Sequence, residues 1–454
     1  MTGATGFLGR KIVSRLVDEG HDVVALTRNP EKAAKTLALP CRFLAWDSLK
    51  DPVPVNALEG VQAVIHLAGE GIAEKRWTAE QKKKIAESRV VGTRALVQAV
   101  RAAAKPPEVF ISASAIGYYG DTADLSIDEQ SPAGTDFLAR VCVDWERETE
   151  PLVASPTRLV TMRTGVVLGA EGGALKALVP LFEWGLGGRV GSGRQWMSWI
   201  HVDDQVSLYL WALRTPEVRG VLNGTAPNPV RNAEWTQALG HALHRPAILP
   251  APAFALRWAL GEMASIVLSG TRALPKRAQA LGFPFVFPTL ESALADLFVD
   301  GPVEILEREQ FIPLPPEAIF PFFAEARNLE KITPPWMGFR VLKSSTETIG
   351  EGTLIDYRLS VHGVPMRWRT RIEEWNPGHR FVDTQLKGPY RHWHHTHQFI
   401  AVKGGTLMRD RVRYRLPAGS LGKLVAGRFV AADVETIFNY RWKKVEELFC
   451  RKQT

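Results

Sequence analysis

Cysteine is scarce in this 454-residue chain, where Cys41, Cys142 and Cys450 stand far apart. An odd number at this spacing gives no disulfide framework and no zinc-binding pattern, and it is typical of a reducing compartment. A basic and apolar leader is also missing, which disfavours secretion. The most apolar helical stretch, 253–268, carries two charged residues and is too short to cross a bilayer. We therefore expect a cytoplasmic protein.

An excess of one charge sign is absent from the first 300 residues, which contain 32 Lys and Arg against 31 Asp and Glu. Residues 301–454 contain 24 against 17, so nearly all of the net charge of +8 belongs to the C-terminal part. Such a basic surface either faces solvent or meets an anionic partner. No nucleic-acid recognition motif accompanies it, and we expect no nucleic-acid partner. The length suits two or three domains.

A glycine-rich segment opens the chain, with glycines at the spacing G-x-x-G-x-x-G. Such a loop turns a strand into a helix and lets a cofactor pyrophosphate approach bare backbone at the helix N-terminus. A strand is expected before the loop, yet only Met1 precedes it. We expect that about eight residues of this strand are missing upstream. The predicted cofactor-binding residues of the loop are Gly3, Thr5, Gly6, Phe7, Leu8 and Gly9.

The residue after the next expected strand, 21–27, decides between two cofactors. An NAD site usually has Asp or Glu at this position to bind the ribose hydroxyls. Here the position holds Arg28, whose guanidinium pairs well with a 2′-phosphate. The sequence therefore favours NADP, with NAD as a possible cofactor and a plain surface arginine as the alternative.

Strands and helices alternate along the first half of the chain and predict a doubly wound parallel sheet. The expected strands are 21–27, 61–67 and 108–112, and the expected helices are 11–20, 31–39 and 80–104. Residues 253–298 read as a helical segment. Beyond the linker expected at 299–302 the apolar period changes to two, and an amphipathic helix follows at 421–449, which predicts an α+β module.

Several long stretches within residues 1–298 resemble extended short-chain dehydrogenases/reductases, and among them the atypical epimerase-family proteins that carry their own C-terminal extension. The resemblance implies a Rossmann domain over 1–247 and a small helical substrate lobe over 248–298. The matching stretches are 66–70 (HLAGE), 75–77 (KRW), 112–121 (SASAIGYYGD), 163–169 (RTGVVLG), 193–204 (GRQWMSWIHVDD) and 223–227 (NGTAP).

This resemblance assigns roles to residues of these stretches. Asp47 should lie near the adenine, and Arg163 belongs to the implied cofactor site. Ser114 matches the serine that helps polarise a substrate carbonyl or hydroxyl, and Tyr118 and Tyr119 follow it on the loop that faces the nicotinamide. The resemblance also implies that three small or apolar residues line the cofactor, namely Leu67, Ala68 and Gly69.

The chain departs from the superfamily at its Tyr-x-x-x-Lys pair, which transfers a proton and holds the ribose. The matching stretch places Phe137 at the tyrosine and Val141 at the lysine, and neither side chain can do acid–base work. A hydride-transfer reaction would then need Ser114, Tyr118, Tyr119 or another group, such as Glu70 or His201, as proton donor. The alternative is a catalytically silent, nucleotide-sensing scaffold or ligand carrier.

Residues 303–450 resemble the START-like, polyketide-cyclase-like (SRPBCC) superfamily of helix-grip folds, through 311–320 (FIPLPPEAIF), 328–336 (NLEKITPPW) and the strand pattern with its long final helix. Such folds leave an apolar cavity, so a lipid-like ligand is expected. Trp368, Trp375, Trp393 and Phe399 either line this cavity or form the core.

A histidine-rich stretch, 392–397, lies in this module. On a strand, His392 and His394 share one face, whereas His395 and His397 share the other. The four imidazoles therefore cannot converge on one ion, and no carboxylate or cysteine is nearby in the sequence. We expect no metal site.

Overall fold

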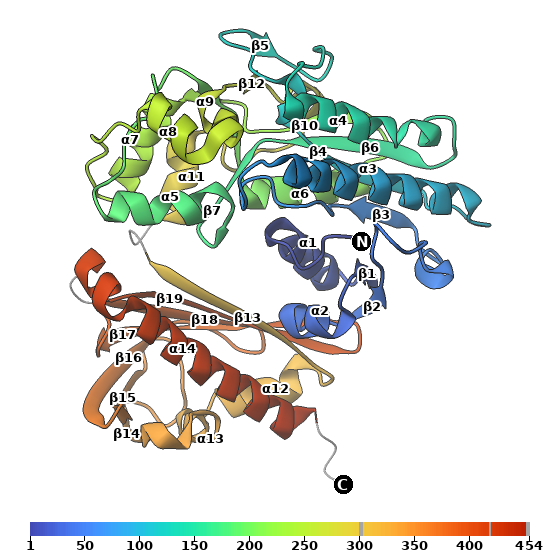
Figure 1. Ribbon diagram of the computed structural model, residues 1–454. Coiled ribbons are helices and arrows are strands. Elements are labelled where there is room, and N and C mark those ends of the chain that lie inside the picture. The colour runs from blue at the N-terminus through green and yellow to red at the C-terminus, as the bar shows by residue number, and fades with distance from the viewer. Residues whose placement is uncertain (299–302, 417–418, 451–454) are drawn as a thin grey trace. The chain divides into compact units, whose positions relative to one another are not determined.

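The computed structural model describes residues 1–298, 303–416 and 419–450 of the chain (Figure 1). The chain divides into two compact units, of which the larger parts are Cys41–Gly301 and Pro302–Thr454. The linker expected at 299–302 lies outside the described residues.

The first unit is built on a parallel sheet. Thr2 forms single parallel bridges with Leu26 and His66 of the two central strands, so Met1 and Thr2 stand between these strands. The doubly wound order predicted from the sequence is confirmed, whereas the expectation of further residues upstream stays a prediction. Across the sheet, the strands are β2 (Cys41–Ala45), β1 (Val23–Thr27), β3 (Ala63–His66), β4 (Val109–Ala115), β6 (Arg158–Thr164) and β10 (Gly220–Gly224).

Helices connect these strands and cover the sheet. The longest, α3 (Ala79–Ala102), starts at Thr78, whose side chain caps it by accepting from the Gln81 N–H. Three apolar residues of α3 pack against Val64 and Phe110 of the sheet. Burial by helices explains why the strands read as continuous apolar runs. The other helices of this layer are α1 (Phe7–Asp18), α2 (Pro30–Leu37), α4 (Phe137–Arg147) and α6 (Val202–Arg214).

A smaller lobe of the first unit combines short helices with pairs of short strands. The helical segment expected through 253–298 is broken, because Gly261 has φ +63° and ends one helix, and Pro275 precedes another. The helices of this lobe are α5 (Gly173–Glu183), α7 (Asn232–Ala242), α8 (Ala253–Leu260), α9 (Ser265–Leu268), α10 (Lys276–Ala280) and α11 (Leu290–Leu297), and the strands are β5 (Ser126–Ile127) with β12 (Arg272–Ala273), β7 (Val166–Gly169) with β9 (Trp199–His201), and β8 (Trp196–Met197) with β11 (Val230–Arg231).

The second unit is an antiparallel sheet of seven strands with a long helix, α14 (Gly419–Phe449), lying along it (Figure 1). Val434 and Phe438 of α14 are buried against the sheet. The predicted helix-grip fold is thus confirmed. In order across the sheet, the strands are β13 (Glu304–Ile312), β19 (Gly405–Arg415), β18 (His392–Val402), β17 (Arg380–Lys387), β16 (Val364–Asn376), β15 (Leu354–Val361) and β14 (Arg340–Ser344), and the short helices are α12 (Pro316–Phe323) and α13 (Leu329–Ile332).

Aromatic side chains fill much of this unit's interior. Phe399 is buried beside Phe320 and Phe381. Trp368 packs edge-on against Trp393, with ring centroids 5.2 Å apart. Of the two roles that the sequence left open for these aromatic residues, cavity lining or core, their contacts with other aromatic rings favour the core.

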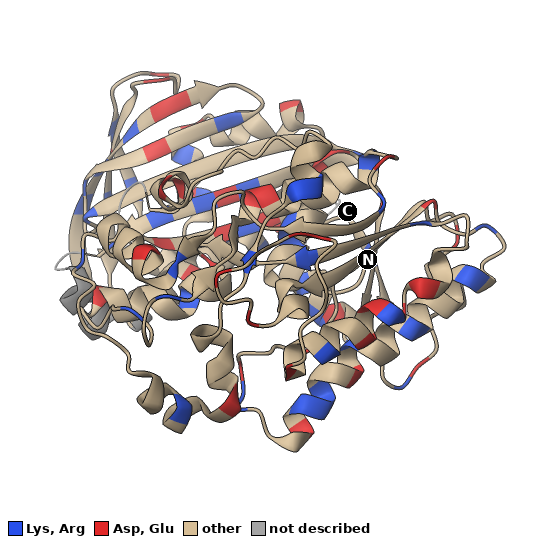
Figure 2. Cartoon of the chain, turned by 90° about the horizontal axis from the view of Figure 1, so that it is seen from above, with Lys and Arg blue, Asp and Glu red and all other residues tan. Residues whose placement is uncertain are grey.

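The arginine rows of the C-terminal strands are interspersed with acidic partners. Arg369 donates from Nε to Asp356 at 2.8 Å, and Arg371 donates to Glu373 at 3.1 Å. Blue and red residues are mixed over helices and strands (Figure 2). This pairing supports a solvated face for these strands, on which carboxylates are interspersed among the arginines. Among the residues that the structure describes, no helix combines the length and the apolar character needed to cross a membrane.

Candidate functional site

The glycine loop packs directly on the end of β3. Gly3 has φ +66°, and a Cβ placed on it would lie 2.9 Å from the carbonyl carbon of Leu67. A Cβ on Gly9 would lie 2.1 Å from the carbonyl oxygen of Gly3. Neither position accepts a larger residue without moving backbone. The loop therefore holds bare backbone at the start of α1, as a pyrophosphate site requires.

A buried hydrogen-bond chain fixes the loop to β3. The Thr2 hydroxyl accepts from the backbone N–H of Leu67 and Ala68, both at 3.1 Å, and donates to Nδ1 of His66 at 2.7 Å. Nε2 of His66 contacts the Thr93 hydroxyl at 2.9 Å, which itself donates to a backbone carbonyl of α3. His66 is therefore neutral, with its proton on Nε2, and burial lowers its pKa to about 3.

Other predicted cofactor residues lie around this loop. Phe7 packs on the turn after β7, where a Cβ on Gly172 would lie 2.3 Å from its ring. Arg28 follows β1 and is exposed. No acidic residue takes the ribose-binding place beside it, since Thr27 and Asn29 flank it. Asp47 follows β2 and accepts from the Leu49 N–H. Thr5 and Gly6 are exposed on the loop. Leu8 lies on α1, and Gly69 follows β3.

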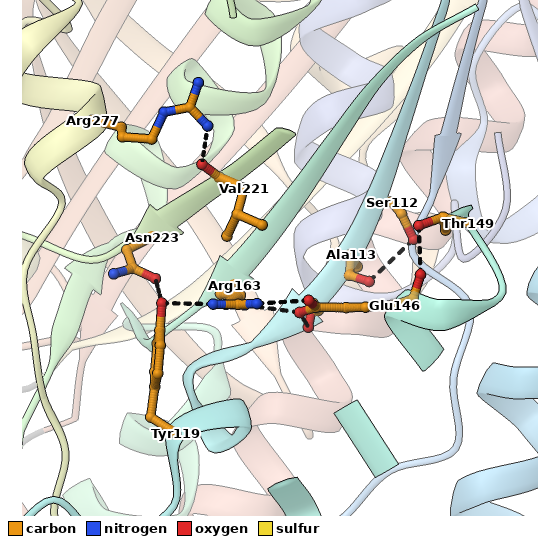
Figure 3. A network of polar contacts seen from close by, with 10 residues as sticks. Ser112, Ala113, Tyr119, Glu146, Thr149, Arg163, Val221, Asn223 and Arg277 are labelled. Atoms are coloured by element: carbon orange, nitrogen blue, oxygen red, sulfur yellow. Dashed lines mark hydrogen bonds and ion pairs between the residues drawn. The ribbon is translucent and has the colours of Figure 1, made fainter. Parts of the chain in front are cut away.

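A polar network crosses the carboxyl ends of β4, β6 and β10 (Figure 3). Ser114 donates to Oε1 of Glu146 at 2.6 Å. Arg163 donates from Nε and Nη2 to the two Glu146 oxygens at 2.9 and 2.7 Å, and from Nη1 to the Tyr119 hydroxyl at 2.9 Å. That hydroxyl donates to Oδ1 of Asn223 at 2.8 Å. We call these five residues the Arg163 network.

The positive charge of Arg163 is balanced by the carboxylate of Glu146 inside the Arg163 network. Burial opposes the charge of Arg163, yet Glu146 and Tyr119 outweigh it, and the pKa of Arg163 lies above its ordinary value. Burial raises the pKa of Tyr119 to about 12, against the effect of Arg163. The Tyr119 hydroxyl donates to Asn223 and accepts from Arg163, so its one proton is committed inside the protein.

Tyr118 differs from its neighbour. Its ring stacks on Arg163, with the guanidinium carbon 3.3 Å from the ring centroid, and packs edge-on against Tyr119. It is half-buried, and within the described residues its hydroxyl has no hydrogen-bond partner. Of the three catalytic candidates named from the sequence, Tyr118 alone offers an uncommitted hydroxyl, because Ser114 and Tyr119 are both engaged.

The helix that faces Ser114 presents different residues from those expected. Phe137 and Val141, assigned from the sequence to the tyrosine and lysine positions, belong to a hydrophobic cluster with Trp77. Burial is the largest influence on the Cys142 thiol and, with Glu146, raises its pKa to about 12, although Arg89 and hydrogen bonds with the backbone and Ser114 favour the thiolate. Since Glu146 also contacts Ser114, the face toward β4 carries Cys142 and Glu146. The assignment of Phe137 and Val141 to the tyrosine and lysine positions stays a prediction, and α4 contains neither a tyrosine nor a lysine.

Sequence reasoning missed Glu146 and Asn223 and left two other candidates open. A carboxylate eight residues after Leu138 on an otherwise apolar helix face was the available signal for Glu146. His201 caps α6 by accepting from the Asp203 N–H at 3.2 Å, so it acts as a structural residue. Glu70 lies after β3, where its backbone N–H donates to Ser88.

Three family models match the chain. The NAD dependent epimerase/dehydratase family matches residues 1–223, a domain of unknown function, DUF1731, matches 251–297, and polyketide cyclase / dehydrase and lipid transport matches 312–439.

Whole-protein comparisons agree with these matches. The chain is 45% identical over 299 residues to an Arabidopsis thaliana protein, "Epimerase family protein SDR39U1 homolog, chloroplastic", covering 65% of this chain and 84% of that one. It is 40% identical over 295 residues to an epimerase family protein of Mycobacterium bovis, with 65% and 95% covered.

A solved structure of the human epimerase family protein SDR39U1 (isoform 2) with NADPH has a TM-score of 0.60 and 33% identity, and the match covers 66% of this chain and 98% of that one. The glycine loop, the parallel sheet and these relatives together show that the chain belongs to the NAD-dependent epimerase/dehydratase family and carries a C-terminal domain of the polyketide cyclase/lipid-transport type.

Proposed function

We propose that the first unit binds NADP and transfers hydride to or from a small or lipid-like substrate. The observation that carries the cofactor choice is Arg28, an exposed guanidinium at the end of β1 where an NAD site has a carboxylate. The glycine loop fits a dinucleotide, because Gly3 and Gly9 leave no room for side chains between backbone and ligand. The NADPH complex of the human relative supports the same choice.

The cofactor, when bound, would donate the hydride as NADPH or accept it as NADP+, and the chain's own residues would hold and orient the substrate. Ser114 already donates its proton to Glu146, so its oxygen is available to accept from a substrate hydroxyl. Tyr118, whose hydroxyl is uncommitted, exchanges a proton with the reacting oxygen. Glu146 and Tyr119 fix the guanidinium on which the Tyr118 ring stacks.

We further propose domain boundaries at 1–247, 248–298 and 303–450 and a cytoplasmic location. The three family matches lie within these boundaries, and all three cysteines are free thiols. The lipid-transport description of the C-terminal family supports an apolar ligand for this domain. Mass spectrometry of small molecules that copurify with the full chain tests this ligand, and recovery of no apolar compound contradicts it.

A second function is favoured by the α4 face. Phe137 and Val141, which the sequence assigns to the tyrosine and lysine positions of the superfamily, lie in a hydrophobic cluster. Cys142 on the same helix has a thiol whose pKa of about 12 keeps it protonated at neutral pH. Such a protein binds the nucleotide without turning it over and acts as a sensor or carrier.

NADPH oxidation with a panel of carbonyl compounds distinguishes the two functions. Hydride transfer predicts turnover that falls about 100-fold or more in Tyr118→Phe, with NADPH binding unchanged. Tyr440→Phe, the same chemical change in the other unit, serves as control. NADPH binding without any turnover contradicts the catalytic proposal and supports the sensor. Turnover that survives in Tyr118→Phe contradicts the role of that hydroxyl.

A further inference from the structure

Two buried histidines of the C-terminal unit lie between two carboxylates. In His395, Nδ1 lies 3.5 Å from Oδ1 of Asp383, and Nε2 lies 3.1 Å from Oδ1 of Asp410. In His397, Nε2 lies 3.1 Å from Oδ1 of Asp383, and Nδ1 lies 2.7 Å from Oδ1 of Asp410. The two rings are 3.7 Å apart between centroids, and both histidines and Asp410 are at most 4% exposed. We call these four residues the histidine–aspartate box.

A count of protons shows that the box is incomplete. Each neutral imidazole carries one N–H, so two neutral rings can make at most two of the four contacts as hydrogen bonds. The remaining contacts set nitrogen lone pairs against carboxylate oxygens. Nδ1 of His397 is such an atom, since it forms no aligned hydrogen bond despite lying 2.7 Å from Asp410. A buried arrangement of this kind needs positive charge between the facing atoms.

A proton on each ring would be one source of that charge. Arg441 supplies one positive charge near Asp410, and its Nε and Nη2 atoms have no hydrogen-bond partner within the described residues. One guanidinium leaves two carboxylates with a net negative charge.

The distances suit a metal ion instead. Bonds of 2.0–2.1 Å in a tetrahedral zinc site separate its ligand atoms by roughly 3.3 Å. Oδ1 of Asp383 lies 3.5 Å from Nδ1 of His395 and 3.1 Å from Nε2 of His397. One ligand atom from each of these three residues lies within 4.8 Å of the other two. We propose that Asp383, His395 and His397 bind a divalent metal ion of the zinc class.

Asp410 takes the role of a positioning residue in this site. It contacts Nε2 of His395 and Nδ1 of His397, the ring atoms opposite the proposed ligand nitrogens. A carboxylate at this place fixes the ring orientation and raises the basicity of the ligands. Asp410 also lines a small pocket between β13, β19 and α14, together with Arg308, Gln310 and Arg441.

The fold explains why the sequence pointed away from a metal. The alternation on β18 does separate His392 and His394 from His395 and His397, as expected. The carboxylates come from neighbouring strands, because the register pairs Asp383 of β17 with His395 and Asp410 of β19 with His397. A single sequence does not display this register.

Metal binding by the full chain, freed of any affinity tag and stripped with a chelator, tests the site. We expect one Co²⁺ or Zn²⁺ per chain at this site, with the absorption bands of tetrahedral Co²⁺ and a higher Tm on addition of metal. His397→Ala should weaken binding about 100-fold and Asp410→Asn about 10-fold. His394→Ala, which removes a histidine from the opposite face of the same strand, should bind as the wild type does.

Two results overturn the proposal. The first is a stripped wild-type chain that takes up neither ion at micromolar concentration, which leaves a protonated box. The second is a His397→Ala variant that binds as tightly as the wild type. If circular dichroism shows that His397→Ala is unfolded, the nearly isosteric Asp383→Asn takes its place, with the same loss of binding expected.

Discussion

The two units bury charge in opposite ways. In the Arg163 network each buried hydrogen-bonding group has its complement, since one guanidinium meets one carboxylate through two hydrogen bonds. In the histidine–aspartate box, two carboxylates face four imidazole nitrogens that carry too few protons. A closed network stabilises a fold and positions its neighbours, whereas an open one requires a ligand.

The largest expected effect is on the closed network. Glu146→Gln leaves Arg163 buried without its counter-charge, and we expect the free energy of unfolding to fall by about 3 kcal/mol. Urea denaturation, following the transition of the first unit, measures this loss. A loss below about 1 kcal/mol would place Glu146 in the class of surface ion pairs and remove the contrast.

Acid should weaken the same unit through His66. Its pKa is about 3 when folded, against an ordinary value of 6.5, so the unfolded chain binds more protons between these values. The stability is complete above pH 6.5 and falls as the pH is lowered, by roughly 2–3 kcal/mol between pH 6.5 and 4.5. Denaturation at both pH values should show a smaller pH-dependent loss in His66→Gln than in wild type. Equal losses would show that the proton is taken up elsewhere.

In the histidine–aspartate box, we expect a comparable isosteric substitution to have little effect on the free energy of unfolding, in contrast to Glu146→Gln. In metal-free protein, Asp383→Asn replaces a carboxylate by an amide that can donate to an imidazole lone pair. We expect a change in the free energy of unfolding of less than about 1 kcal/mol, or a gain. Urea denaturation, following the transition of the second unit, measures this change, and the result is compared with the loss in Glu146→Gln. A loss as large as that of Glu146→Gln would mean that the box is closed by its own protons.

The smallest effect sets the baseline. Glu148 pairs with Arg94 at 2.6 Å near the surface, two residues from Glu146. Glu148→Gln should cost less than about 1 kcal/mol, since solvent and salt screen such pairs. The same urea denaturation checks it, and a cost equal to that of Glu146→Gln would show that burial is not what distinguishes the two glutamates.

The sequence predicted the architecture because its signals are local. The glycine spacing marks a loop that needs Gly3 and Gly9, and the apolar period marks sheet and helix faces. The helix-grip module followed from the period of two and the long final helix. The register of α4 was harder, because Phe137 and Leu138 are both apolar and only the contact of Glu146 with Ser114 decides which face meets β4.

Long-range pairing was beyond the sequence. Asn223 reaches Tyr119 from 104 residues away, and Asp383 and Asp410 reach the histidines from neighbouring strands. Those contacts depend on strand register, which needs both partners to be folded. The histidine stretch predicted correctly which histidines share a face of the strand. It did not indicate that carboxylates of the neighbouring strands lie beside them.

Fluorescence titration of NADPH and NADH into the wild type, Arg28→Ala and Arg101→Ala tests the central claim, that the first unit is an NADP site read by Arg28. We predict tighter binding of NADPH than of NADH, and about a 10- to 100-fold loss for NADPH alone in Arg28→Ala. Arg101→Ala, an exposed arginine in the last turn of α3, should bind as wild type does. Equal binding of both nucleotides by the wild type, or no binding of either, would contradict the account.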